Sequence, residues 1–341
     1  MKTMKDVAEL AEVSVSTVSH VLNGTRKVSE ETRGGVLAAV EKLGYRPNLL
    51  AKGLKTRRTF TIGLLISDIQ NAFFTSLVRG VEDEALSRGY HLFLCNTDED
   101  PEREEEYVTE LAKKRVDGLM VAPSARREEY VRRLRAEGVP FVFVDREVEG
   151  VEADVVSVDN KTGMRLIAEH LVGLGHRRIG MISGPLDKAS GFERYTGLKD
   201  ALAGLGAPLE EGLVRFGDFR TTGGMDGARG LMGLPSPPTA LVIANNQMTL
   251  GALLAAKEAG LSIPKDVSLV GFDDPEWAPL TGPPLTALAQ PTYEMGVRAA
   301  RVLLDRIEGG DGTGPRRILL KPWLEVREST ASLARRQEDG T

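Results

Sequence analysis

Cysteine, histidine and long apolar runs are scarce in this chain of 341 residues, and each scarcity excludes a class of protein. The single cysteine, Cys95, cannot form an intrachain disulfide, and the apolar run around it predicts a small buried side chain. No run of 18 apolar residues occurs, so we expect no membrane-spanning helix. Residues 1–10 are charged and lack the apolar segment of a secretion signal. These features predict a cytoplasmic protein.

The sequence signatures of common enzyme classes are also missing. No G-x-G-x-x-G follows a predicted strand, and neither a G-x-x-x-x-G-K-[ST] phosphate loop nor a G-x-S-x-G nucleophile elbow occurs. The four histidines, at positions 20, 91, 170 and 176, lack metal-ligand spacing, and one cysteine cannot complete a zinc site. We therefore predict a protein that is not an enzyme and that holds neither a metal nor a cofactor.

Charge is divided unequally along the chain. The first 60 residues contain eleven lysines and arginines and six acidic residues, whereas the remainder contains 33 basic and 43 acidic residues. The overall formal charge of −5 hides this division. Because attraction to phosphate depends on local lysines and arginines, the N-terminal segment is predicted to contact nucleic acid.

Two short amphipathic helices are predicted within residues 4–22. The second runs from about Ser14 to Leu22 and places Val18, Val21 and Leu22 on one apolar face. Ser14 is positioned to accept a hydrogen bond from a free amide of the first turn. The opposite face carries small or polar side chains that can approach base edges in a major groove. These are Val15, Ser16, Thr17, Ser19 and His20. By themselves, the two helices suit a structural helical hairpin equally well.

Two further helices are predicted before residue 60. One runs from Ser29 to about Leu43, and each glycine of its Gly34-Gly35 pair costs roughly 0.5–1 kcal/mol relative to alanine. The next begins at Pro47-Asn48 and is about seven residues long, which is below the length that is stable alone in water. Basic residues flank this last helix, so it is suited to fold against an acidic partner.

From residue 60 onward, short apolar runs alternate with amphipathic stretches of helix length. Such alternation predicts parallel sheets with helices on both faces, and its two series predict two subdomains. The predicted strands are 60–67, 90–96, 116–122, 140–145, 177–183, 239–244, 267–272 and 285–290, with a short strand before Phe219 and a late strand near 316–321. The predicted helices lie near 73–89, 101–113, 161–175, 191–204, 222–233, 246–260 and 293–308.

Side chains suited to sugar binding follow the predicted strands, where ligands of such folds bind. Carboxylate, amide and guanidinium groups pair with hydroxyls, and phenylalanine rings cover the C–H faces of a sugar. Singly, each residue could instead cap a helix, pack in the core or form a surface ion pair. Their recurrence at successive strand ends predicts a common site. The residues are Asn71, Phe73, Phe74, Asp145, Arg146, Ser190, Arg194, Phe219, Asn245, Asp273 and Gln290.

Residues 1–60 resemble the headpiece of the LacI/GalR family of bacterial repressors in their DVA, VSxxTVSxVLN and Y-x-PN-x-x-A-x-x-L patterns. In that family, the hinge helices of two subunits pair in the minor groove, and a leucine at the position of Leu54 wedges between base steps. The DNA-contacting residues that this resemblance implies are Ser14, Val15, Ser16, Thr17, Ser19, His20, Asn23, Arg26, Asn48, Ala51, Leu54 and Lys55.

Residues 60–330 resemble type I periplasmic sugar-binding proteins, and ribose-binding proteins most of all. The shared features include an N-x-F-F run at 71–74, a D-R pair at 145–146 and an E-R pair at 193–194. The resemblance implies a pentose effector, ribose first, whereas the role of Lys188 stays open. Another sugar, a purine or a phosphocarrier protein remains an alternative. A transport receptor is disfavoured because the chain has a basic headpiece and no export signal.

The expected fold is an all-α helix-turn-helix headpiece joined to an α/β body of two doubly wound, parallel-sheet subdomains. By resemblance, residues 1–46 form the headpiece, 47–58 the hinge, 59–330 the body and 331–341 a polar tail. The N-subdomain takes about 59–160 and 291–320, and the C-subdomain takes 161–290 and 321–330. We expect a homodimer on a pseudo-palindromic operator, from which a sugar bound between the subdomains releases it.

Overall fold

The computed structural model describes residues 2–23, 26–45, 58–124, 132, 134–136, 138–148, 150–309 and 314–333. The chain forms two compact units, Met1–Thr59 and Phe60–Thr341, which we call the headpiece and the body. Within the described ranges, no helix has both the length and the apolar character needed to cross a membrane.

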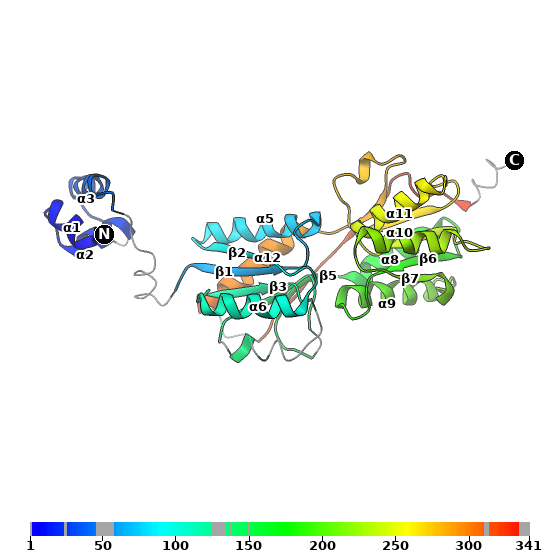
Figure 1. Cartoon of the computed structure of the whole chain (residues 1–341), viewed down its shortest axis with the longest axis horizontal. Coiled ribbons are helices and arrows are strands. Elements are labelled where there is room, and N and C mark those ends of the chain that lie inside the picture. The colour runs from blue at the N-terminus through cyan, green and yellow to red at the C-terminus, as the bar shows by residue number, and fades with distance from the viewer. Residues whose placement is uncertain are drawn as a thin grey trace. The chain divides into compact units, whose positions relative to one another are not determined.

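The described part of the headpiece contains three helices, α1 (Met4–Leu10), α2 (Val15–Asn23) and α3 (Glu30–Leu43), which pack around the buried Val7, Val18 and Val36 (Figure 1). The predicted cap of α2 is confirmed, because Ser14 Oγ accepts a hydrogen bond from the Thr17 amide at 3.1 Å. Helix α3 ends at Gly44, whose φ of 57° suits glycine. The headpiece core is therefore small.

The first sheet of the body is entirely parallel, in the order β11-β5-β4-β3-β1-β2. Helix α6 covers one face, while α5 and α12 pack on each other and cover the other face (Figure 1). We call this half the N-subdomain. Its strands are β1 (Thr61–Ile66), β2 (His91–Asn96), β3 (Gly118–Val121), β4 (Phe141–Val144), β5 (Asp154–Val158) and β11 (Arg317–Leu320). Its helices are α5 (Ala72–Ser87), α6 (Pro101–Lys113) and α12 (Thr292–Ile307).

The second sheet has the order β12-β10-β9-β8-β6-β7, with β12 antiparallel to β10 and the other pairs parallel. We call this half the C-subdomain. Its strands are β6 (Ile179–Ser183), β7 (Val214–Phe216), β8 (Ala240–Ile243), β9 (Ser268–Phe272), β10 (Thr286–Ala289) and β12 (Trp323–Glu325). Its helices are α8 (Asn160–Gly173), α9 (Ala189–Gly204), η1 (Glu211–Leu213), α10 (Thr221–Met232), α11 (Asn246–Glu258) and η2 (Ala278–Leu280).

The chain passes between the two subdomains at residues 158–160, 289–292 and 320–323. Each passage joins an element of one sheet directly to an element of the other half, with few residues between them. Short connections of this kind permit rotation of one half against the other without disturbing either core.

Every strand predicted in the body is present within three residues of its expected bounds, and so are the seven predicted helices. The prediction omitted β5 and β12. Strand β5 has the sequence DVVSV, and β12 spans only three residues, so neither gave a long apolar run.

The prediction that residues 90–96 form a buried strand is wrong for the side chains. Phe93 and Leu94 are 44% and 38% exposed, and Cys95 is only partly buried. The reason is that β2 lies at the sheet edge, where β1 is its only neighbour in the sheet. An apolar run predicts that a strand is shielded from water, but the surface that shields it can belong to another molecule.

Helices α5 and α12 approach so closely that glycine is required at their contact. A Cβ on Gly296 would lie 2.1 Å from the Leu77 carbonyl oxygen, and one on Gly80 would lie 2.1 Å from the Tyr293 carbonyl oxygen. We expect Gly296→Ala to destabilise the body by about 1–3 kcal/mol, because the helices must move apart.

Urea unfolding of the purified protein checks this expectation. The matched control is Gly204→Ala at the end of α9, where an added Cβ meets no atom within 4 Å. That change should stay within about 0.5 kcal/mol of the wild type. Equal stabilities of the two variants would contradict the close helix contact.

Candidate functional site

At the start of α2, three predicted DNA-contacting residues lie at the surface. Ser14, Val15 and Ser16 are exposed, and Val15 remains 44% exposed although it is apolar. Ser14 Oγ lies 2.7 Å from Ser16 Oγ and 2.8 Å from Thr17 Oγ1. Hydroxyls beside an exposed methyl-bearing side chain suit hydrogen bonding to base edges and contact with thymine methyl groups.

The remaining residues of the predicted DNA surface are placed less completely. Ser19 and His20 are half-buried on α2, Asn23 is its last residue, and Arg26 is exposed after it. Asn48, Ala51, Leu54 and Lys55 lie outside the described residues, as does the whole predicted hinge helix.

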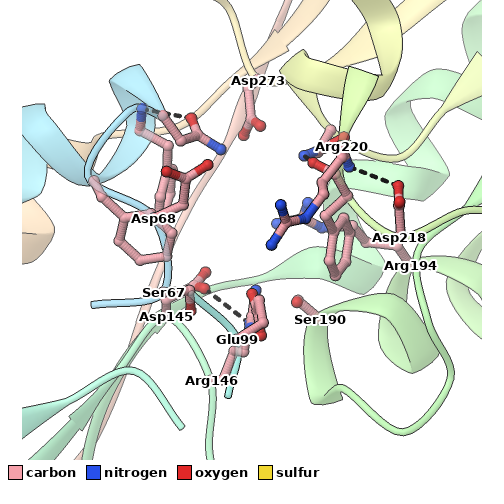
Figure 2. A pocket seen from close by; sticks show the side chains of 15 residues that line it. Ser67, Asp68, Glu99, Asp145, Arg146, Ser190, Arg194, Asp218, Arg220 and Asp273 are labelled. Atoms are coloured by element: carbon pink, nitrogen blue, oxygen red, sulfur yellow. Dashed lines mark hydrogen bonds and ion pairs between the residues drawn. The ribbon is translucent and has the colours of Figure 1, made fainter. Parts of the chain in front are cut away.

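In the body, side chains from both subdomains line one cleft (Figure 2). The space between them is about 530 Å³, including the part that opens to solvent. Ten of the eleven predicted sugar-binding residues line it, namely Asn71, Phe73, Phe74, Asp145, Arg146, Ser190, Arg194, Phe219, Asn245 and Asp273. Gln290 does not line it. Instead, its Nε2 donates to Asp273 Oδ1, so Gln290 positions that carboxylate.

The sequence analysis missed five further lining residues, which are Ser67, Asp68, Glu99, Asp218 and Arg220. Ser67 and Asp68 directly follow β1, Glu99 follows β2, and Asp218 and Arg220 flank Phe219. Applying the strand-end rule to every polar residue of these loops, instead of only to residues matching sugar-binding proteins, would have found them.

Four lining residues have a backbone conformation that is rare outside glycine. Glu99, Asp145, Phe219 and Asp273 have φ angles of 63°, 67°, 64° and 74°. Each follows the end of a strand by at most three residues. Such residues cost about 1–3 kcal/mol each and are concentrated at functional sites. Their grouping around one cleft is evidence for function that is independent of residue type.

Arg194 is held rigidly at the C-subdomain side of the cleft. Its Nε donates to Asn160 Oδ1 at 2.8 Å, its Nη1 donates to the Ala244 carbonyl at 2.6 Å, and its guanidinium lies 3.7 Å from the centre of the Phe272 ring. Burial lowers the pKa of Arg194, and the negative charge of Asp273 opposes that shift. A buried guanidinium fixed in this way presents its remaining donors in one direction.

A hydrogen bond between Asn71 and Asn246 links the two subdomains. Asn71 Oδ1 accepts from the Phe73 amide at 3.0 Å and thereby caps α5, and it also accepts from Asn246 Nδ2 at 2.7 Å. Asn245 caps α11 by accepting from the Met248 amide, and its Nδ2 donates to the Phe219 carbonyl. The asparagine side chains that cap these helices therefore also line the cleft.

Among the described residues, several buried oxygens in and beside the cleft have no hydrogen-bond partner. Two of them are Asp145 Oδ1 and Asn246 Oδ1. Burial raises the pKa of Asp145, and it does the same for Asp273. A buried acceptor without a donor is costly, so both oxygens are suited to a ligand that carries hydroxyl donors.

Comparison with known proteins identifies the family. Residues 3–48 match the sequence profile of the bacterial regulatory proteins of the lacI family, and residues 168–330 match that of a periplasmic binding protein-like domain. The chain is 37% identical over 335 residues to the HTH-type transcriptional repressor PurR of Aliivibrio salmonicida, which covers 98% of this chain and 100% of that protein. The chain belongs to the lacI family.

Other LacI-family proteins also match this chain. The ribose operon repressor of Escherichia coli K12 is 40% identical over 310 residues, which cover 90% of this chain and 93% of that repressor. The lac repressor dimer bound to operator and the anti-inducer ONPF has a TM-score of 0.87 at 31% identity, covering 97% of this chain and 99% of that one. A regulator from Enterococcus faecium with bound ribose has a TM-score of 0.72 at 33% identity, covering 80% and 99%.

These comparisons confirm the predicted family and fold class. The protein is a LacI-family, DNA-binding transcriptional repressor with a helix-turn-helix headpiece and a ligand-binding body of periplasmic-binding-protein type. The relatives differ in what their names say they respond to, so the comparisons leave the effector open.

A buried carboxyl beside the cleft makes the stability of this LacI-family body depend on pH. Glu104 is 3% exposed, and its Oε2 accepts from the Ser124 amide at 2.7 Å. Burial raises the pKa of Glu104 from 4.5 to about 7, and the charge of Glu99 adds to the rise. Between these two pH values the folded protein keeps a proton that the unfolded chain releases. The stability gained from this retained proton on Glu104 is therefore lost as pH rises from 4.5 to 7.

We expect Glu104→Gln to remove this pH dependence. At pH 8 the variant should be more stable than the wild type by up to about 3 kcal/mol, whereas the two should be alike near pH 5. Urea unfolding at both pH values measures the difference. Glu102→Gln, an exposed change on the same helix, is the control and should alter neither value. A variant no more stable than the wild type at pH 8 would contradict the raised pKa.

Proposed function

We propose that this repressor binds its operator as a homodimer and releases it when a pentose, D-ribose first, binds the cleft. The observation that carries the proposal is the make-up of the cleft. Phenylalanine rings come from both subdomains, with Phe73 and Phe74 on one side and Phe219 on the other. The carboxylates of Asp145 and Asp273 and the guanidinium groups of Arg146 and Arg194 complete the lining, as a polyhydroxylated ring requires.

The geometry supports a small ring. The Phe73 and Phe74 rings meet edge to face, with centroids 5.0 Å apart, so two different ring surfaces border the cleft. Arg146 lies over Phe219, with 5.4 Å between the guanidinium carbon and the ring centre. Aromatic faces suit the C–H surfaces of a sugar, while charged groups hydrogen-bond to its hydroxyls. Relatives named for the ribose operon, or solved with ribose, support the same choice.

Homodimer formation is supported by apolar side chains left at the surface of the body. Leu250 and Leu254 on α11 are 37% and 41% exposed, Leu280 is 83% exposed, and Phe93 and Leu94 on β2 are also exposed. Isolated domains rarely keep this much aliphatic surface in water. A twofold dimer would present two headpieces to a pseudo-palindromic operator, and the related lac repressor was solved as a dimer on its operator.

The proposed switch uses the hinge connections of the body. A sugar that contacts both subdomains favours one angle between them, and rotation about the three connections changes the spacing of the chain segments that lead to the headpieces. In this proposal the Leu54 segment pairs with its counterpart in the minor groove only at the correct spacing. The ligand shifts the equilibrium by its different affinities for the two states, typically about 1–3 kcal/mol.

A purine corepressor is the second candidate, because the PurR relative covers nearly the whole chain. The cleft favours the sugar. A planar base needs stacking surfaces and few carboxylates, whereas the carboxylates of Asp145 and Asp273 line this cleft and Asp145 Oδ1 is a buried acceptor without a partner among the described residues. The two candidates also predict opposite effects on DNA binding, since an inducer weakens it and a corepressor strengthens it.

The proposal is tested by fluorescence anisotropy with an operator selected by the purified protein from a random DNA pool. We expect D-ribose to lower operator affinity at least tenfold and hypoxanthine to have no effect. Tighter operator binding with hypoxanthine would favour the purine candidate. Operator affinity unchanged by every sugar and purine offered would overturn the small-ligand proposal.

Within this assay, Asp273→Asn should abolish the ribose response and leave the affinity of the ligand-free protein for DNA unchanged. The reason is that Asp273 lines the cleft and is held by Gln290 and by the Asn246 amide, far along the chain from the headpiece. Glu276→Gln is the matched control, because Glu276 is exposed and does not line this cleft. A normal ribose response in Asp273→Asn would remove this residue from the proposed site.

A further inference from the structure

The carboxylate of Glu99 lies beside Arg146 at one end of the cleft (Figure 2). Its Oε2 accepts a hydrogen bond from Arg146 Nη1 at 2.8 Å and lies 3.5 Å from Lys188 Nζ. Arg146 belongs to the N-subdomain and Lys188 to the C-subdomain. Lys188 Nζ also donates to the Ser124 carbonyl, and Arg146 Nε lies 3.3 Å from Asp145 Oδ2. One carboxylate is therefore shared by a cation from each subdomain.

The other described groups of the cleft give an anion little attraction. Five carboxylates and three arginines line it, so the lining is net negative when all are ionised. Arg194 is already bound to Asn160 and to the Ala244 carbonyl. Arg220 is exposed, and Asp68 and Asp218 line the same space (Figure 2).

Helices α9 and α10 begin beside the cleft and have no side-chain cap. Two other helices that begin there are capped, α5 by Asn71 and α11 by Asn245. Helix N-termini bind phosphate through free backbone amides, and other phosphate sites use arginines or lysines that are free to pair with it. At α5 and α11, a cap already occupies amides that would hold a phosphate.

We propose that Glu99 is a specificity-determining residue that restricts the cleft to uncharged pentoses and excludes their phosphate esters. This inference rests on the proposed function and narrows its ligand class. An uncharged sugar donates its hydroxyls to the carboxylates, whereas a phosphate dianion would be repelled by them and would find Arg146 and Lys188 already paired. Moving such a charge out of water among buried carboxylates is strongly unfavourable.

Glu99 remains ionised in this arrangement. Burial raises the pKa of Glu99, but the charges of Arg146 and Lys188 outweigh burial and hold it below its ordinary value. Its backbone φ of 63°, next to Asp98 at 54°, is unusual for both residues and directs the loop after β2 toward the cleft.

The experiment is isothermal titration of the full-length protein with D-ribose, with D-ribose 5-phosphate and with inorganic phosphate. We expect the wild type to bind ribose at least 100-fold more tightly than the ester and to bind no inorganic phosphate. Glu99→Gln keeps the shape of the side chain and removes the carboxylate shared by the two cations, leaving Arg146 beside Asp145 and Lys188 on the Ser124 carbonyl, so it should reduce the preference for ribose at least tenfold. Glu102→Gln removes the same charge from an exposed position on α6 and should keep the wild-type preference.

Lys188→Met provides the opposite test, because it removes a cation and leaves Glu99 paired with Arg146. This variant should still reject the ester. Thermal melting of each variant verifies that it is folded. If Glu99→Gln does not fold, the wild type and Lys188→Met still decide the matter, since a gain of ester binding by Lys188→Met would overturn the inference.

The remaining outcomes separate this inference from the proposed function. Equal binding of ribose and its ester by the wild type would overturn the exclusion of phosphate and leave a pentose-based effector in place. An unchanged preference in folded Glu99→Gln would overturn the role of Glu99. Failure of the wild type to bind either compound would overturn the proposed pentose effector and, with it, the inference.

Discussion

The strands of a parallel sheet all deliver their following loops to one edge, and the rest of this structure depends on that constraint. In the body, loops from the ends of β1, β4, β8 and β9 supply side chains to a single cleft. Residues as distant along the chain as Asn71 and Asn246 thereby come within hydrogen-bonding distance. The two sheets are separate, and the cleft lies between them.

The cleft concentrates features that a stable fold alone would avoid. Arg146, Arg194, Asp145 and Asp273 are all buried charged residues, and both aspartates also have positive φ angles. Each feature destabilises the empty protein, since buried charge and rare backbone conformations are costly. Opposite charges, the Phe272 ring and backbone carbonyls offset part of that cost. The unpaired oxygens of Asp145 and Asn246 show where the compensation within the described residues is incomplete and where ligand hydroxyls would add to it.

Local sequence patterns were sufficient for most elements of the fold. Apolar runs located the strands of both sheets, except β5 and β12. Helical periodicity located seven α-helices of the body. Capping residues marked helix ends, as at Ser14 and Gly44. The position of β2 at the sheet edge could not be predicted from its own sequence, and the prediction that it is buried was therefore wrong. Whether a strand has one neighbour or two depends on chain topology, which hydrophobicity along a single segment does not encode.

The sequence alone also determined which residue types follow each strand, and hence the chemistry available at the strand ends. Tertiary structure decided how those groups pair. Glu99 was not among the predicted site residues, because it follows an edge strand and belongs to an acidic run. Folding nevertheless brings Arg146 and Lys188 to it from opposite subdomains. Likewise, folding brings Gln290, which is predicted to contact ligand, to Asp273, to which its Nε2 donates a hydrogen bond. Such partners are distant along the chain, and their distances are set only when the two cores pack.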